Sequence, residues 1–297
     1  MRRTASLLLL VGLVGLALPL HAQVESQFLI PLSTADGKRA TVGQNDLVFA
    51  EDGKAVKVLK IEPVDAPVRV TLALENSRGL SDNWVLVRQG AQAFIDLMPP
   101  EVEVTLMSTA PQARVVVKST TDHAALKKGI DAISSDAGAG RFIESFVDWS
   151  DRIDKDKDKS KFTPVLVTLG STFGEEMVRE SDVKKAVDRL PVLNATVHVI
   201  LYNAKSNQGG SSDAQIAVAQ NITGRTRGKY EMIGSYLQVG PALAEIGGDV
   251  AKMQTGGQYL VTVERPAGSP TNRIGSLAVT APAGVTVGRI SMVAPKK

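Results

Sequence analysis

The sequence contains no cysteine and only three histidines among its 297 residues. Without cysteine there can be no disulfide, no thiolate metal site, no cysteine nucleophile and no lipid-modified cysteine behind a leader segment. The protein must therefore be held together by its core, and a chain of this length can bury a large one. Only His123 and His198 lie beyond the N-terminal segment, and their spacing suggests no catalytic partner for either.

Long apolar runs are scarce, and the one that is present stands at the N-terminus. MRRTASLLLLVGLVGLALPLHAQ has two arginines, an apolar segment from Leu7 to Leu20 and then a small residue, Ala22. This is the layout of a signal peptide, and the apolar segment is short for a membrane span. We therefore predict that residues 1–22 are a signal peptide. The protein would be exported to a periplasmic or extracellular location, with no membrane span after cleavage.

The sequence also lacks an excess of charge of one sign. The formal net charge is +3, and removal of Arg2 and Arg3 with the leader leaves a net charge of +1. No face is predicted to carry one sign, so we expect no nucleic-acid partner. A calcium loop at DKDKDKSK (Asp154–Lys161) is not predicted either, because Lys159 stands where such a loop needs glycine and Val165 where it needs glutamate.

The middle of the chain alternates predicted strands with predicted helices. APVRVTLAL, FTPVLVTLG and ATVHVILYNA are apolar and rich in β-branched residues, and amphipathic helical segments separate them. EVEVTLMST and ARVVVKS are divided only by residues 110–112, so they should be antiparallel neighbours. The predicted fold class is α/β: a doubly wound, mostly parallel sheet of Rossmann type with helices on both faces and one antiparallel edge strand.

Both ends of the mature chain are predicted to form β-structure. Residues 23–66 contain strand patches joined by the turns Asp36-Gly37 and Asp52-Gly53, and residues 256–297 contain three more strands. Either group alone would make a marginal sheet. We therefore expect the two ends to pair into one small β-sandwich beside an α/β domain of residues 67–255.

The order of strands and helices, the hairpin, and the placing of ENSRG after the first strand resemble the von Willebrand factor type A fold. NDLVFAEDGKAVKVLKIEPVDAPVRVTLALENS is similar to the opening of a secreted bacterial family related to these domains, of acidobacterial type. There, an acidic-Gly-Lys hairpin leads into the first strand of the A domain. QYLVTVERP and the basic strand pair after it resemble that family's ending. The resemblance extends over nearly all of the mature chain and implies a role in joining proteins.

The resemblance also implies a metal site, from which this sequence departs. Type A domains usually bind Mg²⁺ through an Asp-x-Ser-x-Ser loop, a threonine before the third helix and an aspartate after the fourth strand. Mg²⁺ needs this set because it is a hard, octahedral ion that takes several oxygens at short distances. The corresponding positions here are Glu75, Ser77, Gly79, Arg141 and Leu169. We therefore predict a degenerate site that holds no metal, and no other cofactor.

Two interpretations of Arg141 stay open. It would either fill the place of the ion and pair with Glu75, because a guanidinium is always charged and grips a carboxylate with two bonds, or be solvated. Ser77 would act as a turn residue.

The sequence shows no constellation for catalysis, so we predict that the protein is not an enzyme. The predicted function is a protein-binding module that acts without Mg²⁺, with an unidentified protein partner. The candidate binding surface consists of Arg78, Leu80, Arg141 and Ser171. The alternative is a structural scaffold of the cell envelope with no defined ligand.

Overall fold

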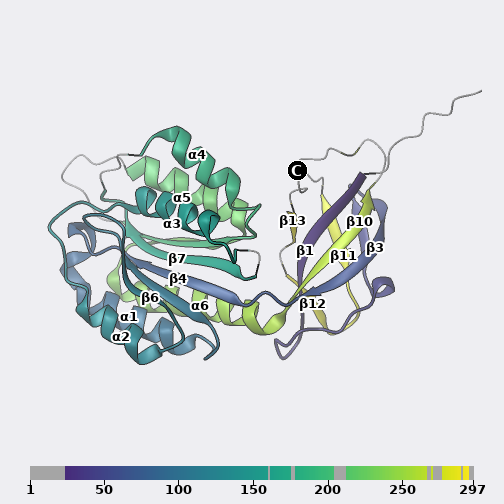
Figure 1. The fold of residues 1–297 in the computed structure, drawn as a ribbon, viewed down its shortest axis with the longest axis horizontal. Helices are drawn as coiled ribbons and strands as arrows, with labels where there is room; N and C mark the ends of the chain where they lie inside the picture. The colour runs from purple at the N-terminus through teal and green to yellow at the C-terminus, as the bar shows by residue number, and fades with distance from the viewer. Residues whose placement is uncertain are drawn as a thin grey trace, which may run out of the picture.

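The chain folds into an α/β unit and an all-β unit that lie side by side (Figure 1). The computed structural model describes residues 24–159, 161–174, 178–203, 212–265, 269, 276–288 and 290–293. The predicted signal peptide, residues 1–22, lies outside the described residues. None of the helices in the described part of the chain is both long and apolar enough to span a membrane.

The α/β unit is built on a six-stranded sheet with the order β6-β5-β4-β7-β8-β9. All neighbouring strands are parallel except β6, which is antiparallel to β5 at the edge, so the predicted hairpin is confirmed. The strands are β4 (Val68–Leu74), β5 (Glu103–Ser108), β6 (Arg114–Thr120), β7 (Thr163–Ser171), β8 (Thr196–Tyr202) and β9 (Tyr230–Ile233).

Helices cover both faces of this sheet (Figure 1). One face packs against α1 (Trp84–Leu97), α2 (His123–Ala132) and α6 (Val239–Gly256), and the other against α3 (Phe142–Lys155), α4 (Glu180–Arg189) and α5 (Ser212–Thr226). Two 3₁₀ helices, η2 (Arg78–Asn83) and η3 (Tyr236–Gln238), lead into α1 and α6.

The sequence of the central strand β4 is apolar on both sides because each side faces a core beneath helices. Val70 and Leu72 point into the core beneath α1 and α6, whereas Ala73 belongs to the core beneath α3. The polar Thr71 is buried among these residues and its hydroxyl accepts a hydrogen bond from Trp149 Nε1 at 3.1 Å. A parallel sheet covered on both faces leaves no solvated side for polar residues, and a buried polar group needs a partner.

The all-β unit is made from both ends of the described chain. Val24 to Pro31 of β1 pair antiparallel with Arg265 to Gln258 of β10. The full order is β11-β2-β3-β10-β1-β12, with β13 also paired to β1. The strands are β1 (Val24–Thr34), β2 (Val48–Glu51), β3 (Lys54–Val64), β10 (Gln258–Arg265), β11 (Leu277–Thr280), β12 (Val285–Val287) and β13 (Ser291–Val293), with the 3₁₀ helix η1 (Gln44–Asp46) before β2.

This arrangement corrects the expected β-sandwich, because hydrogen bonds join all seven strands into one sheet instead of two facing sheets. The long strand β3 pairs with β2 at its start and with β10 along the rest, and β1 pairs with three other strands. The sheet therefore curves around a single core that includes Phe28, Phe49 and Val261. The turn between β2 and β3 has positive φ at Asp52 (49°) and Gly53 (75°), as a two-residue hairpin requires.

A buried ion pair crosses this core. Arg265 is 1% exposed, and its Nε donates to Glu51 Oε2 at 2.8 Å while its Nη2 donates to Glu51 Oε1. Ser26 Oγ lies 3.5 Å from the third nitrogen of the same guanidinium. Because a charge withdrawn from water must be paired and hydrogen-bonded, each partner of this pair depends on the other.

Candidate functional site

The carboxyl ends of the neighbouring strands β4 and β7 bring the predicted site residues together. Leu74 at the end of β4 stands beside Leu169 of β7 in the register of the sheet. Glu75 follows β4, and its backbone N–H donates to the Leu169 carbonyl at 2.9 Å. In open α/β sheets this edge is where ligands bind.

The carboxylate of Glu75 is buried and accepts hydrogen bonds from two serines. Ser77 Oγ and Ser171 Oγ each donate to Oε1 at 2.5 Å, and the Ser171 backbone N–H donates to Oε2 at 2.8 Å. Glu75 is only 1% exposed. A charge removed from water is stabilised by such charge-assisted hydrogen bonds, so the serines replace the solvent that the carboxylate has lost.

Two glycines allow the backbone to pack directly against this cluster. A Cβ on Gly140 would lie 2.4 Å from the Glu75 carboxyl carbon, and a Cβ on Gly79 would lie 2.2 Å from Ser171 Oγ. Neither position can accept a side chain unless its neighbours move. At Gly79 the type A motif has its second serine, so the space for that serine is taken by Ser171.

The loop of residues 134–141 covers the cluster and is tied to the segment after Glu75. Asn76 Nδ2 donates to the Ser134 carbonyl at 2.9 Å, and Asp136 N donates to the Asn76 carbonyl at 2.6 Å. Arg78 N donates to the Gly138 carbonyl at 3.1 Å. These hydrogen bonds hold the loop in place over Glu75, which explains why the cluster is buried.

Two other predicted positions also contribute no metal-binding oxygen from a side chain. Leu169 is fully buried and packs into the core beneath α1 and α6. Arg141 is the N-cap residue of α3, its side chain is 19% exposed, and its Nη1 lies 3.9 Å from Glu144 Oε2. The pair between Arg141 and Glu75 stays one of the two open interpretations of Arg141. Within the described residues, no group of three or more His, Asp or Glu side chains could hold a metal ion.

The structure corrects the candidate binding surface. Of its four residues, Arg78 is exposed and Arg141 is partly exposed, but Leu80 and Ser171 are both fully buried. Leu80 turns into the core because η2 packs beneath α1, and Ser171 turns towards Glu75. Sequence reasoning missed Asn76 and Gly140 as parts of the site. Only their positions in the sequence could have indicated that they belong to the site, because Asn76 follows Glu75 directly and Gly140 precedes Arg141.

The buried histidine His198 lies in β8, away from this cluster. Its Nδ1 accepts a hydrogen bond from the Lys229 backbone N–H at 3.2 Å, and burial lowers its pKa from 6.5 to about 4. The imidazole is therefore neutral near pH 7. Among the described residues its Nε2 has no hydrogen-bond partner.

No known family's sequence profile matches this chain, and no curated protein matches its sequence. Its structural neighbours include von Willebrand factor A domains. A von Willebrand factor type A protein from Catenulispora acidiphila is 12% identical, with a TM-score of 0.49, over 92% of this chain and 74% of that one.

An aerotolerance-related membrane protein from Bacteroides fragilis is 14% identical, with a TM-score of 0.45, over 63% of this chain and 100% of its own. The pilus adhesin SpaC from Lactobacillus rhamnosus is 13% identical, with a TM-score of 0.49, over 82% of this chain and 46% of its own. Likenesses of this strength transfer no ligand, partner or activity to this chain.

Proposed function

We propose that this chain is an exported, non-catalytic protein-binding module of von Willebrand factor A type that works without Mg²⁺. The observation that carries the proposal is the hydrogen bonding of the Glu75 carboxylate by Ser77 and Ser171. Export rests on the signal-peptide layout of residues 1–22.

The residues at this edge of the sheet do not fit Mg²⁺. An ion at Glu75 would have to displace the hydroxyl groups that already donate to its carboxylate. It would then need further oxygens to complete an octahedral shell, and the side chains of Gly79 and Leu169 offer none. The two serine hydroxyls and the Ser171 backbone N–H stabilise the carboxylate by hydrogen bonding, at the place where a cation would stabilise it by its charge.

A partner would contact the exposed rim around this edge instead of the buried cluster. Arg78 is exposed, Val85 at the start of α1 is 61% exposed, and Leu237 of η3 is 74% exposed. Tyr236 Oη lies 3.5 Å from the Gly79 carbonyl, which places η3 next to η2. Exposed apolar side chains occur at protein-interaction surfaces, and arginine is enriched in protein interfaces.

Melting curves test the metal part of the proposal. The mature protein is treated with a chelator and melted with and without Mg²⁺ or Mn²⁺ at millimolar concentration. A ligand that binds only the folded state raises the melting temperature. Because we propose that neither ion binds, we expect no change in the melting temperature. A saturable rise that disappears in Glu75→Ala would show that the site takes the ion after all.

Capture from the native envelope fraction tests the binding part. The mature protein is used as bait in the presence of a chelator, with Leu237→Asp as the interface variant and Val192→Asp as the matched control. Val192 is also an exposed apolar residue, at 62%, but it lies in the link between α4 and β8. We expect one partner that Leu237→Asp loses and Val192→Asp keeps. Finding no such partner would favour the scaffold alternative, and capture that requires Mg²⁺ would contradict the proposal.

A further inference from the structure

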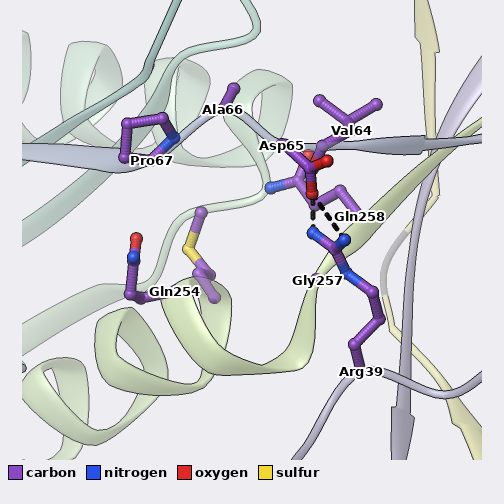
Figure 2. Close-up of a pocket in the computed structure, with 9 residues that line it drawn as sticks. Arg39, Val64, Asp65, Ala66, Pro67, Gln254, Gly257 and Gln258 are labelled. Carbon is purple, nitrogen blue, oxygen red and sulfur yellow. Dashed lines mark hydrogen bonds and ion pairs between the residues drawn. The ribbon is translucent and has the colours of Figure 1, made fainter.

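The two units are joined at one place, where the chain crosses between them twice. One crossing is residues 65–67 between β3 and β4, and the other is Gly257 between α6 and β10. Val64 and Gln258 are a register pair at the ends of β3 and β10, so the two crossings enter the all-β unit side by side. Figure 2 shows both crossings around a pocket of about 210 Å³.

Arg39, from the link between β1 and β2, contacts both crossings. Its Nη1 lies 2.5 Å from Asp65 Oδ1, and its Nη2 donates to the Val64 carbonyl at 3.1 Å (Figure 2). The same side chain packs on Gly257, where a Cβ would lie 2.1 Å from Arg39 Nε. Gly257 also has a φ of +68°, a conformation that favours glycine.

Two hydrogen bonds from the end of α6 also hold the junction together. Gln254 of α6 accepts a hydrogen bond from the backbone N–H of Val68, the first residue of β4, at 2.8 Å. Thr255 Oγ1 donates to the Gly37 carbonyl in the all-β unit at 3.3 Å. Among the described residues, Arg39 both makes an ion pair at the first crossing and packs against the second. It is therefore the side chain best placed to resist bending of the link that the two crossings form.

We propose that Arg39 is a positioning residue, which holds the α/β unit in a fixed orientation on the all-β unit by contacting both crossings. We call its contacts with Asp65, Val64 and Gly257 the Arg39 latch. The Arg39 and Asp65 side chains are 36% and 77% exposed, so salt screens their attraction. The orientation of the two units is therefore sensitive to ionic strength through this pair.

Distance measurements between spin labels test the latch. Because the chain has no cysteine, cysteines introduced at the exposed positions Lys54 and Lys185, one in each unit, are the only labelled sites. We expect a narrow distance distribution in the mature protein. Arg39→Ala should broaden and shift it, and the matched control Lys38→Ala, which removes an exposed neighbouring cation, should leave it unchanged.

Two further measurements keep the result interpretable. Asp65→Asn removes the ion pair at an exposed position, so it should broaden the distribution even if Arg39→Ala folds poorly. At about 1 M salt the screening length falls to roughly 3 Å. The distance distribution of the unmodified protein should then broaden, and the distribution of Arg39→Ala should not change further. Distributions as narrow in both variants as in the unmodified protein would overturn the proposal. This outcome is independent of whether the module binds a partner.

Discussion

Ser171 donates its hydroxyl to the Glu75 carboxylate at 2.5 Å, although the two residues are 96 positions apart in the sequence. The contact exists because β4 and β7 are parallel neighbours that end at the same edge of the sheet. It joins the two central strands through a buried charge, and the stability of the α/β unit should depend on it.

Replacing Ser171 by Ala should lower the free energy of unfolding by about 1–3 kcal/mol, because it removes a hydrogen bond to a buried carboxylate. Urea unfolding of the mature protein measures the change. The matched control is Ser119→Ala, whose hydroxyl donates to the more exposed Glu103 at 2.7 Å. The control should change stability by less than about 0.5 kcal/mol. Equal effects of the two substitutions would show that the Glu75 cluster has no special role.

Replacing Gly79 by Ser, the residue that the type A motif has at the corresponding position, should destabilise the protein by about 1–3 kcal/mol through overpacking. The reason is the 2.2 Å distance between the new Cβ and Ser171 Oγ. In a double-mutant cycle with Ser171→Ala, the combined cost should be smaller than the sum of the single costs, because the second change removes the clashing atom. Strictly additive costs would mean that the two positions do not compete for space.

Replacing Glu51 by Gln should destabilise the all-β unit by about 3–5 kcal/mol, because it removes the carboxylate charge that pairs with the buried Arg265 guanidinium. The control is Glu62→Gln, which breaks an exposed pair with Lys60 and should cost about 0–1 kcal/mol. Denaturant unfolding, followed by hydrogen exchange in β1 and β10, locates the loss. A cost for Glu51→Gln within the range of the control would contradict the structural role of the pair.

His198 should make the protein less stable in mild acid. Its pKa is 6.5 in the unfolded chain and about 4 in the folded one, so the unfolded state binds more protons between these values. The contribution of neutral His198 to the free energy of unfolding is fully present above pH 6.5 and is lost as the pH falls towards 4. At 1.36 kcal/mol per pH unit, the loss is at most about 3 kcal/mol. NMR titration of the imidazole should show no protonation above about pH 5 in the folded protein. A midpoint near 6.5 would contradict the assigned burial.

The regular elements were accessible from the sequence where local rules decide them. The short link of residues 110–112 predicted the β5–β6 hairpin, and Asp52-Gly53 predicted a two-residue turn. The apolar, β-branched run before Glu75 predicted a buried strand, which is β4. The sandwich was misjudged because local patterns give the strands but not the number of sheets into which distant strands pair.

The sequence by itself determined which atoms are absent from the site. Glycine, arginine and leucine at three of the five motif positions carry no side-chain oxygen, whereas Glu75 and Ser77 do, and this follows from side-chain chemistry alone. Only the tertiary structure decided what the remaining groups do. Ser171 turns inward to Glu75, Leu80 enters the core, and Arg39 reaches across both chain crossings. Each of these depends on segments far apart in the chain, whose packing no local spacing specifies.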